Sequence, residues 1–122
     1  MKKNKVLVVE DDTVTKNFLS QLIERLGYKV DSCENGLEAI KKIKSFKPDL
    51  ILSDVLMPEC SGLQLLNYIQ KKTPSNIPIV LISSLDLSEM EGVAEEVGAV
   101  GFIPKPPRED KIAEMFEKAF RV

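Results

Sequence analysis

One aspartate stands at the point where a hydrophobic segment of the chain ends. In the stretch DLILSDVLMPECSG, residues 49–62, an apolar run leads directly to Asp54. Burying an unpaired carboxylate at such a place costs several kcal/mol (roughly 2–7 for a polar group, more for a charge), so the residue needs a compensating role. Asp54 is therefore the first candidate for chemistry.

Other reactive or charged side chains follow the remaining apolar runs. These side chains are Glu10, Asp11, Ser83 and Lys105. Three carboxylates gathered a few Å apart would repel one another, by ~4 kcal/mol for each pair at an effective dielectric constant near 20. They must share protons or hold a cation. Because only oxygen ligands are offered, we expect Mg²⁺, which needs few protein carboxylates and keeps its waters.

The composition excludes several classes of function. The chain has no histidine, which rules out any mechanism that uses an internal histidine base. Its net charge of −2 argues against direct binding of nucleic acids or membrane surfaces. No apolar run approaches the ~20 residues of a membrane span, and the first residues do not form a signal peptide. Although Cys33 and Cys60 could form a disulfide, a chain of this size does not need one, so we expect reduced thiols and a cytoplasmic protein.

The elements that position these side chains can be predicted from hydrophobic periodicity. Five apolar runs predict strands over residues 5–9, 28–33, 50–53, 79–83 and 99–103. The first, third and fourth are continuous, as expected for strands buried on both faces, whereas the other two suit sheet edges. Amphipathic patterns predict helices over residues 13–26, 36–46, 62–72, 86–97 and 108–120.

Strict alternation of strands and helices predicts one α/β domain over residues 1–122. We expect a three-layer, doubly wound, flavodoxin-like fold with a five-stranded parallel sheet in the order 2-1-3-4-5. In such a sheet the strand order reverses between the first and third strands, and ligands bind in the crevice at their carboxyl ends. Glu10, Asp11 and Asp54 should meet in that crevice.

Each of these residues also has a simpler interpretation. Acidic residues after a strand often cap the following helix, and we expect Asp12 to do so for the helix at 13–26. Ser83 alone could be a turn hydroxyl, Lys105 a solvated surface lysine, and Phe102 a core residue. The site is favoured because all of these groups fall on the same edge of the predicted sheet.

Four segments resemble the signature segments of the bacterial response-regulator receiver domain. They are VLVVEDD, DLILSDVLMPECSG, IPIVLISS and GAVGFIPKP, which occur in the family's order across the whole chain. The resemblance implies that Asp54 accepts a phosphoryl group from a sensor histidine kinase or a histidine phosphotransfer protein. It also implies a Mg²⁺ site at Glu10, Asp11 and Asp54, with the backbone carbonyl of Leu56 as a further ligand.

The same resemblance assigns the remaining residues. Ser83 matches the hydroxyl that meets the phosphoryl group, and Lys105 matches the lysine that pairs with it. Phe102 matches the aromatic switch residue, and Pro106 the proline that often follows a cis peptide bond. A downstream protein or effector domain would bind the face around Phe102 and the last helix. Such a module is not an enzyme, apart from phosphotransfer to, and dephosphorylation of, its own aspartate.

Two other functions remain open at this stage. A receiver-like interaction domain could bind partners without phosphorylation, although the intact acidic set and Lys105 argue against it. An enzyme of the same architecture, such as an aspartyl-phosphate hydrolase or a flavin protein, is a further alternative. Many such phosphatases have a second acid two residues after the nucleophile, where this chain has Leu56. The acids that end the first strand would also repel a flavin phosphate.

Overall fold

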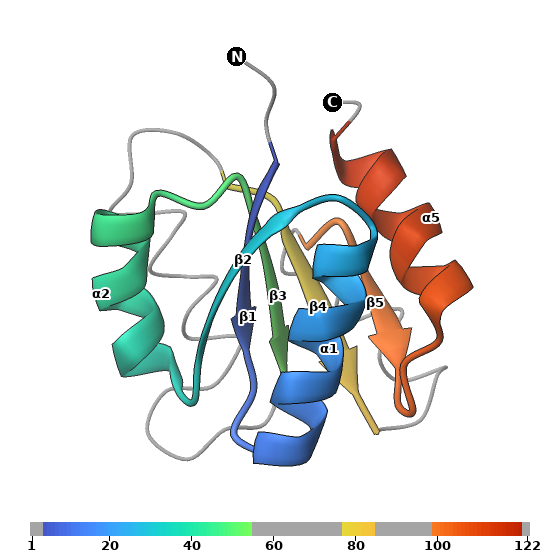
Figure 1. Ribbon diagram of the computed structural model, residues 1–122, viewed down its shortest axis with the longest axis horizontal. Helices are drawn as coiled ribbons and strands as arrows, with labels where there is room; N and C mark the ends of the chain where they lie inside the picture. Colours follow the sequence, from blue (N-terminus) through green and yellow to red (C-terminus); the bar gives the residue numbers. More distant parts are fainter. Residues whose placement is uncertain (1–3, 55–76, 85–98, 121–122) are drawn as a thin grey trace.

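The computed structural model describes residues 4–54, 77–84 and 99–120. Within them, five parallel strands form one sheet in the order β2-β1-β3-β4-β5 (Figure 1), which confirms the predicted topology. The strands are β1 (Lys5–Val9), β2 (Lys29–Cys33), β3 (Leu50–Asp54), β4 (Ile79–Ser83) and β5 (Gly101–Pro104). The described helices are α1 (Thr13–Arg25), α2 (Gly36–Phe46) and α5 (Glu109–Phe120). The helices predicted over 62–72 and 86–97 lie outside the described residues.

Helices cover both faces of the sheet, so the molecule has three layers. In Figure 1, α1 and α5 lie on one face and α2 on the other. Alternate residues of β1 enter different cores, since Val8 packs with residues of α1 and α5 whereas Leu7 packs with residues of α2. This follows from the two-residue repeat of a strand, which points successive side chains to opposite faces. None of the described helices is long and apolar enough to cross a membrane.

The strength of each apolar run decides its place in the sheet. Every residue of β3 and β4 is buried, and so are four of the five residues of β1. The edge strand β2 has the pattern KVDSC, in which only Cys33 is fully buried. Strands covered on both faces must be apolar throughout, so the three continuous runs occupy the centre as predicted.

The ends of the helices follow the capping residues in the sequence. The Asp12 side chain accepts a hydrogen bond from the backbone N–H of Thr15 at 2.9 Å, which makes it the N-cap of α1. Asn35 caps α2 by accepting from the backbone N–H of Glu38, also at 2.9 Å. The first helix ends before Gly27, whose φ of 102° is accessible to glycine but strained for other residues.

Two strands end later than the periodicity predicts. Asp54 is itself a residue of β3 and stands opposite Ile82 of β4, so the carboxylate projects from the sheet rather than from a loop. The last strand begins at Gly101 and reaches Pro104, which stands opposite Ser83. Pairing with the neighbouring strand decides where these two strands end. The last strand can include Pro104 because a proline is tolerated on an edge strand. The carboxyl ends of β4 and β5 are therefore level.

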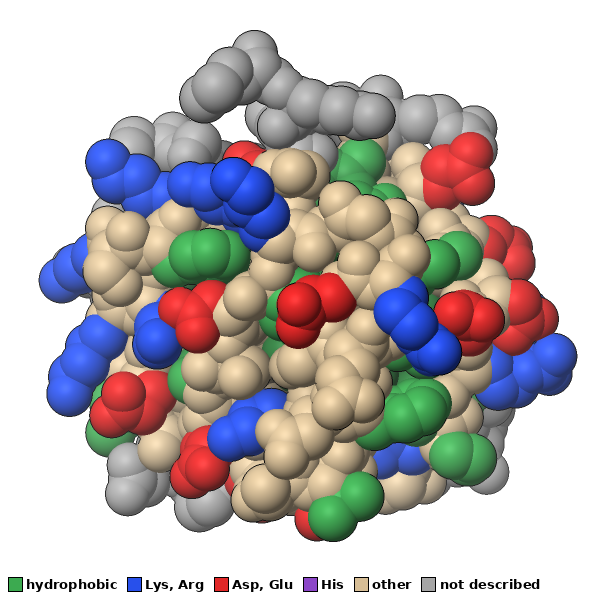
Figure 2. Space-filling model, viewed as in Figure 1, with side chains coloured by type: hydrophobic (Ala, Val, Ile, Leu, Met, Phe, Trp, Pro, Cys, Tyr) green, Lys and Arg blue, Asp and Glu red, His purple; other side chains and the backbone are tan. Residues whose placement is uncertain are grey.

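On the face formed by α1 and α5, acidic and basic side chains are interspersed over the part that the structure describes (Figure 2). Two of them form an ion pair between the helices, with 3.8 Å between Nη2 of Arg25 and Oε1 of Glu109. Below this layer, the ring of Tyr28 stacks on Phe120 and meets Phe116 edge to face. These aromatic contacts fix α5 against the start of β2.

Candidate functional site

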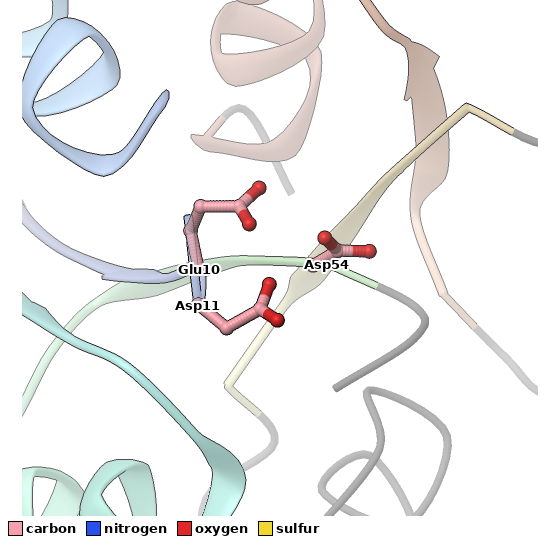
Figure 3. Close-up of side chains that lie close together, drawn as sticks. All are labelled: Glu10, Asp11 and Asp54. Atoms are coloured by element: carbon pink, nitrogen blue, oxygen red, sulfur yellow. The ribbon is translucent and has the colours of Figure 1, made fainter. Parts of the chain in front are cut away.

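The strand register brings the predicted acidic residues to one edge of the sheet. In β1, Val9 pairs with Ser53 of β3, so Glu10 and Asp11 follow β1 next to the end of β3 at Asp54. The backbone N–H of Glu10 donates to the carbonyl of Cys33 at 3.1 Å, which ties this point to β2 as well. Figure 3 shows the three carboxylates facing a common space. The three acids thus meet, as predicted, at the carboxyl edge of the sheet where the strand order reverses.

The three acids are close enough to share one metal ion. A carboxylate oxygen from each of Glu10, Asp11 and Asp54 lies within 4.8 Å of the others. Glu10 and Asp54 are buried, with residue exposures of 0% and 7%, whereas Asp11 is exposed. Two of the three carboxylates that could hold a metal are therefore fixed by packing, and the third is presented from the solvent side.

Lys105 reaches into the same crevice from the other side. Its Nζ lies 2.8 Å from Oδ2 of Asp54 and 2.8 Å from Oε1 of Glu10. The lysine directly follows β5, and its backbone N–H donates to the carbonyl of Ser83 at 2.8 Å. The Lys105–Pro106 peptide bond is cis, as the resemblance implied. One ammonium therefore bridges two of the three carboxylates.

The two oxygens of Glu10 have different environments. Oε2 accepts a hydrogen bond from the backbone N–H of Asp12 at 3.1 Å. Oε1 is buried and has no hydrogen-bond donor among the described groups. The Lys105 ammonium lies 2.8 Å away and forms an ion pair with this oxygen.

Burial dominates the ionisation of Glu10. It raises the pKa of this carboxyl from 4.5 to about 6, and the negative charge of Asp54 adds to the effect, while the Lys105 ammonium opposes it. For Lys105, burial lowers the pKa, but the contacts with Asp54 and Glu10 outweigh it, so the pKa is raised overall. The lysine is accordingly a permanent positive charge in this crevice.

A hard divalent cation fits these residues. The donors are all carboxylate oxygens, which Mg²⁺ prefers, and one of them is a buried oxygen without a hydrogen-bond donor among the described residues. Glu10, Asp11 and Asp54 carry three negative charges against one on Lys105, so a net negative charge remains to attract the ion. The predicted fourth ligand, the carbonyl of Leu56, lies outside the described residues.

Ser83 and Phe102 lie close to this edge but in different positions. Ser83 is the last residue of β4, and it is buried. Phe102 is half-buried and packs against the core on the α2 side of the sheet. The neighbouring Gly101 faces α5 instead, where a Cβ would lie 2.8 Å from the sulfur of Met115. Ser83 thus ends its strand at the edge of the sheet that carries the acids, whereas the Phe102 ring belongs to the core on the α2 side.

Sequence reasoning missed two properties of the acidic pair. It assigned Asp12 to helix capping only, although its backbone N–H also orients Glu10. The sequence did contain a signal for this hydrogen bond. The first N–H groups of a helix need acceptors, and Glu10 precedes the helix by only a few residues. It also treated Glu10 and Asp11 as equivalent, whereas one is buried and the other exposed.

Comparison with known proteins identifies the family. The family model described as the response regulator receiver domain matches residues 6–117. The chemotaxis protein CheY of Listeria monocytogenes is 35% identical over 116 residues, which cover 94% of this chain and 97% of that protein. CheY of Thermotoga maritima is 34% identical over 115 residues, covering 93% of this chain and 95% of that protein.

Solved structures agree with this result. The signal receiver domain of a signal transduction histidine kinase from Syntrophus aciditrophicus superposes with a TM-score of 0.83 at 32% identity, covering 97% of this chain and 90% of the other. Chemotaxis response regulator CheY4 of Vibrio cholerae gives a TM-score of 0.86 at 25% identity and covers 97% and 99% of the two chains. An acidic crevice with a bridging lysine, on a 2-1-3-4-5 sheet, thus occurs in a chain that belongs to the response regulator receiver domain family.

Proposed function

We propose that this receiver domain accepts a phosphoryl group on Asp54 from the phosphohistidine of a sensor kinase or a histidine phosphotransfer protein. The observation that carries the proposal is the position of the Asp54 carboxylate. It ends a buried strand, contacts the Lys105 ammonium at 2.8 Å, and lies within 4.8 Å of oxygens of Glu10 and Asp11. Because the chain contains no histidine, the donor imidazole must come from another protein.

In the proposed reaction, an oxygen of Asp54 attacks the phosphorus atom of the donor. A phosphorus–oxygen bond to the aspartate forms as the phosphorus–nitrogen bond breaks, and the bonding electron pair stays on the imidazole nitrogen. Lys105 contributes positive charge beside the incoming phosphoryl group, and the Ser83 hydroxyl donates to one of its oxygens. Glu10, Asp11 and Asp54 would hold Mg²⁺, which neutralises charge on the phosphoryl oxygens. The chain itself catalyses this step and the later hydrolysis, and no other reaction.

The signal would leave the site through β5 and α5. Phe102 connects the two regions, since it lies in β5 directly before the segment that carries Lys105. We infer that phosphorylation alters the contacts of this ring and thereby the face that it shares with the last helix. A downstream protein or an effector domain would recognise that face, and the Leu56 carbonyl would complete the metal site. Among the relatives, the methylesterase of Archaeoglobus fulgidus aligns over only 30% of its length.

We also infer a cytoplasmic location, since reduced thiols suit this chain. Cys33 is buried, and burial raises the pKa of its thiol to about 12. A thiol with so high a pKa is almost entirely protonated and reacts slowly with disulfides.

The experiment is phosphorylation by a small phosphodonor, which needs no knowledge of the partner. The purified chain is incubated with acetyl phosphate and Mg²⁺, and its intact mass is measured. We expect addition of one phosphoryl group to the wild type and none to Asp54→Asn. Asp31→Asn is the matched control, because Asp31 is an aspartate of β2 paired with Lys42 away from the crevice. An unmodified wild type, or equal modification of Asp54→Asn, would overturn the proposal.

A further inference from the structure

One edge of the sheet is formed by β2, which pairs only with β1 among the described strands. The backbone N–H of Lys29 donates to the carbonyl of Asn4 at 2.8 Å, so the backbone groups of Lys29 face β1. In a parallel strand the backbone groups of successive residues alternate between the two sides of the strand. The N–H and C=O groups of Val30 and Ser32 therefore point away from β1, toward the outer side of this edge.

The Asp31 side chain lies over the outer side of β2. Its Oδ1 accepts a hydrogen bond from the backbone N–H of Ser32 at 2.8 Å. Its Oδ2 accepts from Nζ of Lys42 in α2 at 2.9 Å. Both charged side chains are partly shielded, with exposures of 33% for Asp31 and 35% for Lys42. One outward N–H of the edge is thus already bound by a side chain that a helix holds in place.

The alternation of side chains along β2 explains how α2 can hold this carboxylate. Cys33 packs in the core on the α2 side of the sheet, whereas Val30 packs against the core on the opposite face. Because side chains alternate along a strand, Asp31 points to the same face as Cys33. Lys42 precedes the buried Ile43 in α2, so it stands at the margin of the same core. The contact between helix and edge therefore follows from the fold.

The two outer strands of the sheet differ in what they offer to another strand. β5 ends at Pro104, which has no N–H to donate. β2 has the sequence KVDSC, which contains no proline and includes the strand-favouring Val30. An edge with outward backbone groups can pair with another chain, and charged side chains on the edge prevent this. In β2 the charged side chain in that position is Asp31.

We propose that the β2 edge is a pairing surface for a second copy of this chain, which Asp31 keeps closed while Lys42 holds it. The occupant is a second copy because two identical edges related by a two-fold axis pair antiparallel, so that outward N–H groups meet outward carbonyls. Antiparallel pairing would place the acidic groups of the two copies at opposite ends of one continuous sheet. This inference goes beyond the proposed function and does not depend on phosphorylation of Asp54.

The test is the self-association of the purified chain, measured by sedimentation equilibrium over a range of concentrations. Asp31→Val removes the carboxylate and keeps a residue that favours strands, so we expect at least tenfold stronger association than in the wild type, equivalent to ~1.4 kcal/mol. Lys42→Met leaves the carboxylate in place but no longer held, and it should give a smaller gain. This second variant also serves if Asp31→Val does not fold, as judged by circular dichroism.

Matched controls separate an opened edge from a change in charge or in apolar surface. Lys29→Val places the same residue on the same face of β2, but the backbone groups of Lys29 face β1. Lys41→Met removes the neighbouring ammonium of α2, which pairs with Glu38 of the same helix at 3.7 Å. We expect both controls to associate within twofold of the wild type (~0.4 kcal/mol).

A double variant tests whether the β2 edge itself is the surface that pairs. Ser32→Pro removes the outward N–H and should leave the pairing with β1 intact, since proline is tolerated where the N–H faces away from the sheet. Added to Asp31→Val, it should return the association to the wild-type level. Protection of the Val30 and Ser32 amides from hydrogen exchange in the Asp31→Val dimer is the second measurement, used if the double variant does not fold.

Three results would overturn the proposal. The first is unchanged association in both Asp31→Val and Lys42→Met. The second is an equal gain in Lys29→Val or Lys41→Met, which would assign the effect to apolar surface or to charge. The third is a gain that survives Ser32→Pro, or a dimer whose Val30 and Ser32 amides exchange as fast as in the monomer, because the copies would then associate through another surface.

Discussion

Replacing Glu10 by glutamine should stabilise the protein in the absence of divalent cations. Glutamine keeps the shape of the side chain and an oxygen that can accept from the backbone N–H of Asp12, but it carries no charge. In the wild type, burial raises the pKa of Glu10, which means that the folded state disfavours the ionised carboxylate despite the nearby ammonium of Lys105. Removing this charge therefore relieves a cost.

The size of the effect follows from the pKa. The value rises from 4.5 to about 6 on folding, and at 1.36 kcal/mol per pKa unit this corresponds to ~2 kcal/mol as an upper bound. Since the folded state binds the proton more tightly than the unfolded state, the contribution of Glu10 to stability falls as the pH rises from 4.5 to 6. Glu10→Gln should thus exceed the wild type by up to ~2 kcal/mol at neutral pH and lose this advantage below about pH 4.5.

Urea unfolding followed by far-ultraviolet circular dichroism, with EDTA present, measures both free energies across this pH range. Glu34→Gln is the control, because Glu34 is exposed and its ion pair with Lys16 lies outside the acidic group; it should change stability by no more than about 0.5 kcal/mol. With saturating Mg²⁺ the order should reverse, since only the wild type keeps all three carboxylates. A variant less stable than the wild type at neutral pH without Mg²⁺, or a difference independent of pH, would show that the Lys105 contact outweighs burial.

Three further predictions concern the metal, the core and the output face. Asp11→Ala should bind Mg²⁺ at least tenfold more weakly by calorimetry, yet be no less stable without the ion, because it loses both a ligand and a repulsive charge; equal affinity would refute the assignment. Phe116→Ala should lose about 3–5 kcal/mol in urea unfolding, since this ring is fully buried and contacts two other rings. Amide exchange with and without a bound phosphate mimic should change around Phe102 and in α5, whereas changes confined to residues 10–50 would contradict the proposed output face.

Local features of the structure could be predicted from the sequence because each depends on neighbours in the chain. The predicted N-cap Asp12 forms its hydrogen bond with a residue three positions away, so a short motif suffices to place it. The order of the strands was also predictable, since it requires only that the most apolar runs be covered on both faces. The predicted strand order was enough to place Asp54 at the carboxyl edge of the sheet, beside the end of the first strand.

The roles of the individual acids within that edge were decided by the tertiary structure. Glu10 and Asp11 are adjacent in sequence and similar in chemistry, yet packing buries one and exposes the other. The bridge from Lys105 to Asp54 joins residues 51 positions apart. The contact of the same lysine with Glu10, also at 2.8 Å, likewise joins segments that are far apart in the sequence.

The sequence by itself thus determined which residues gather in the crevice, because a parallel sheet brings the carboxyl ends of its strands to one edge whatever their side chains. Only the tertiary structure decided which carboxylate loses its water and which two carboxylates the Lys105 ammonium bridges. Burial and ion pairing depend on atoms brought together from distant segments, so only their positions in the folded chain set the pKa of Glu10.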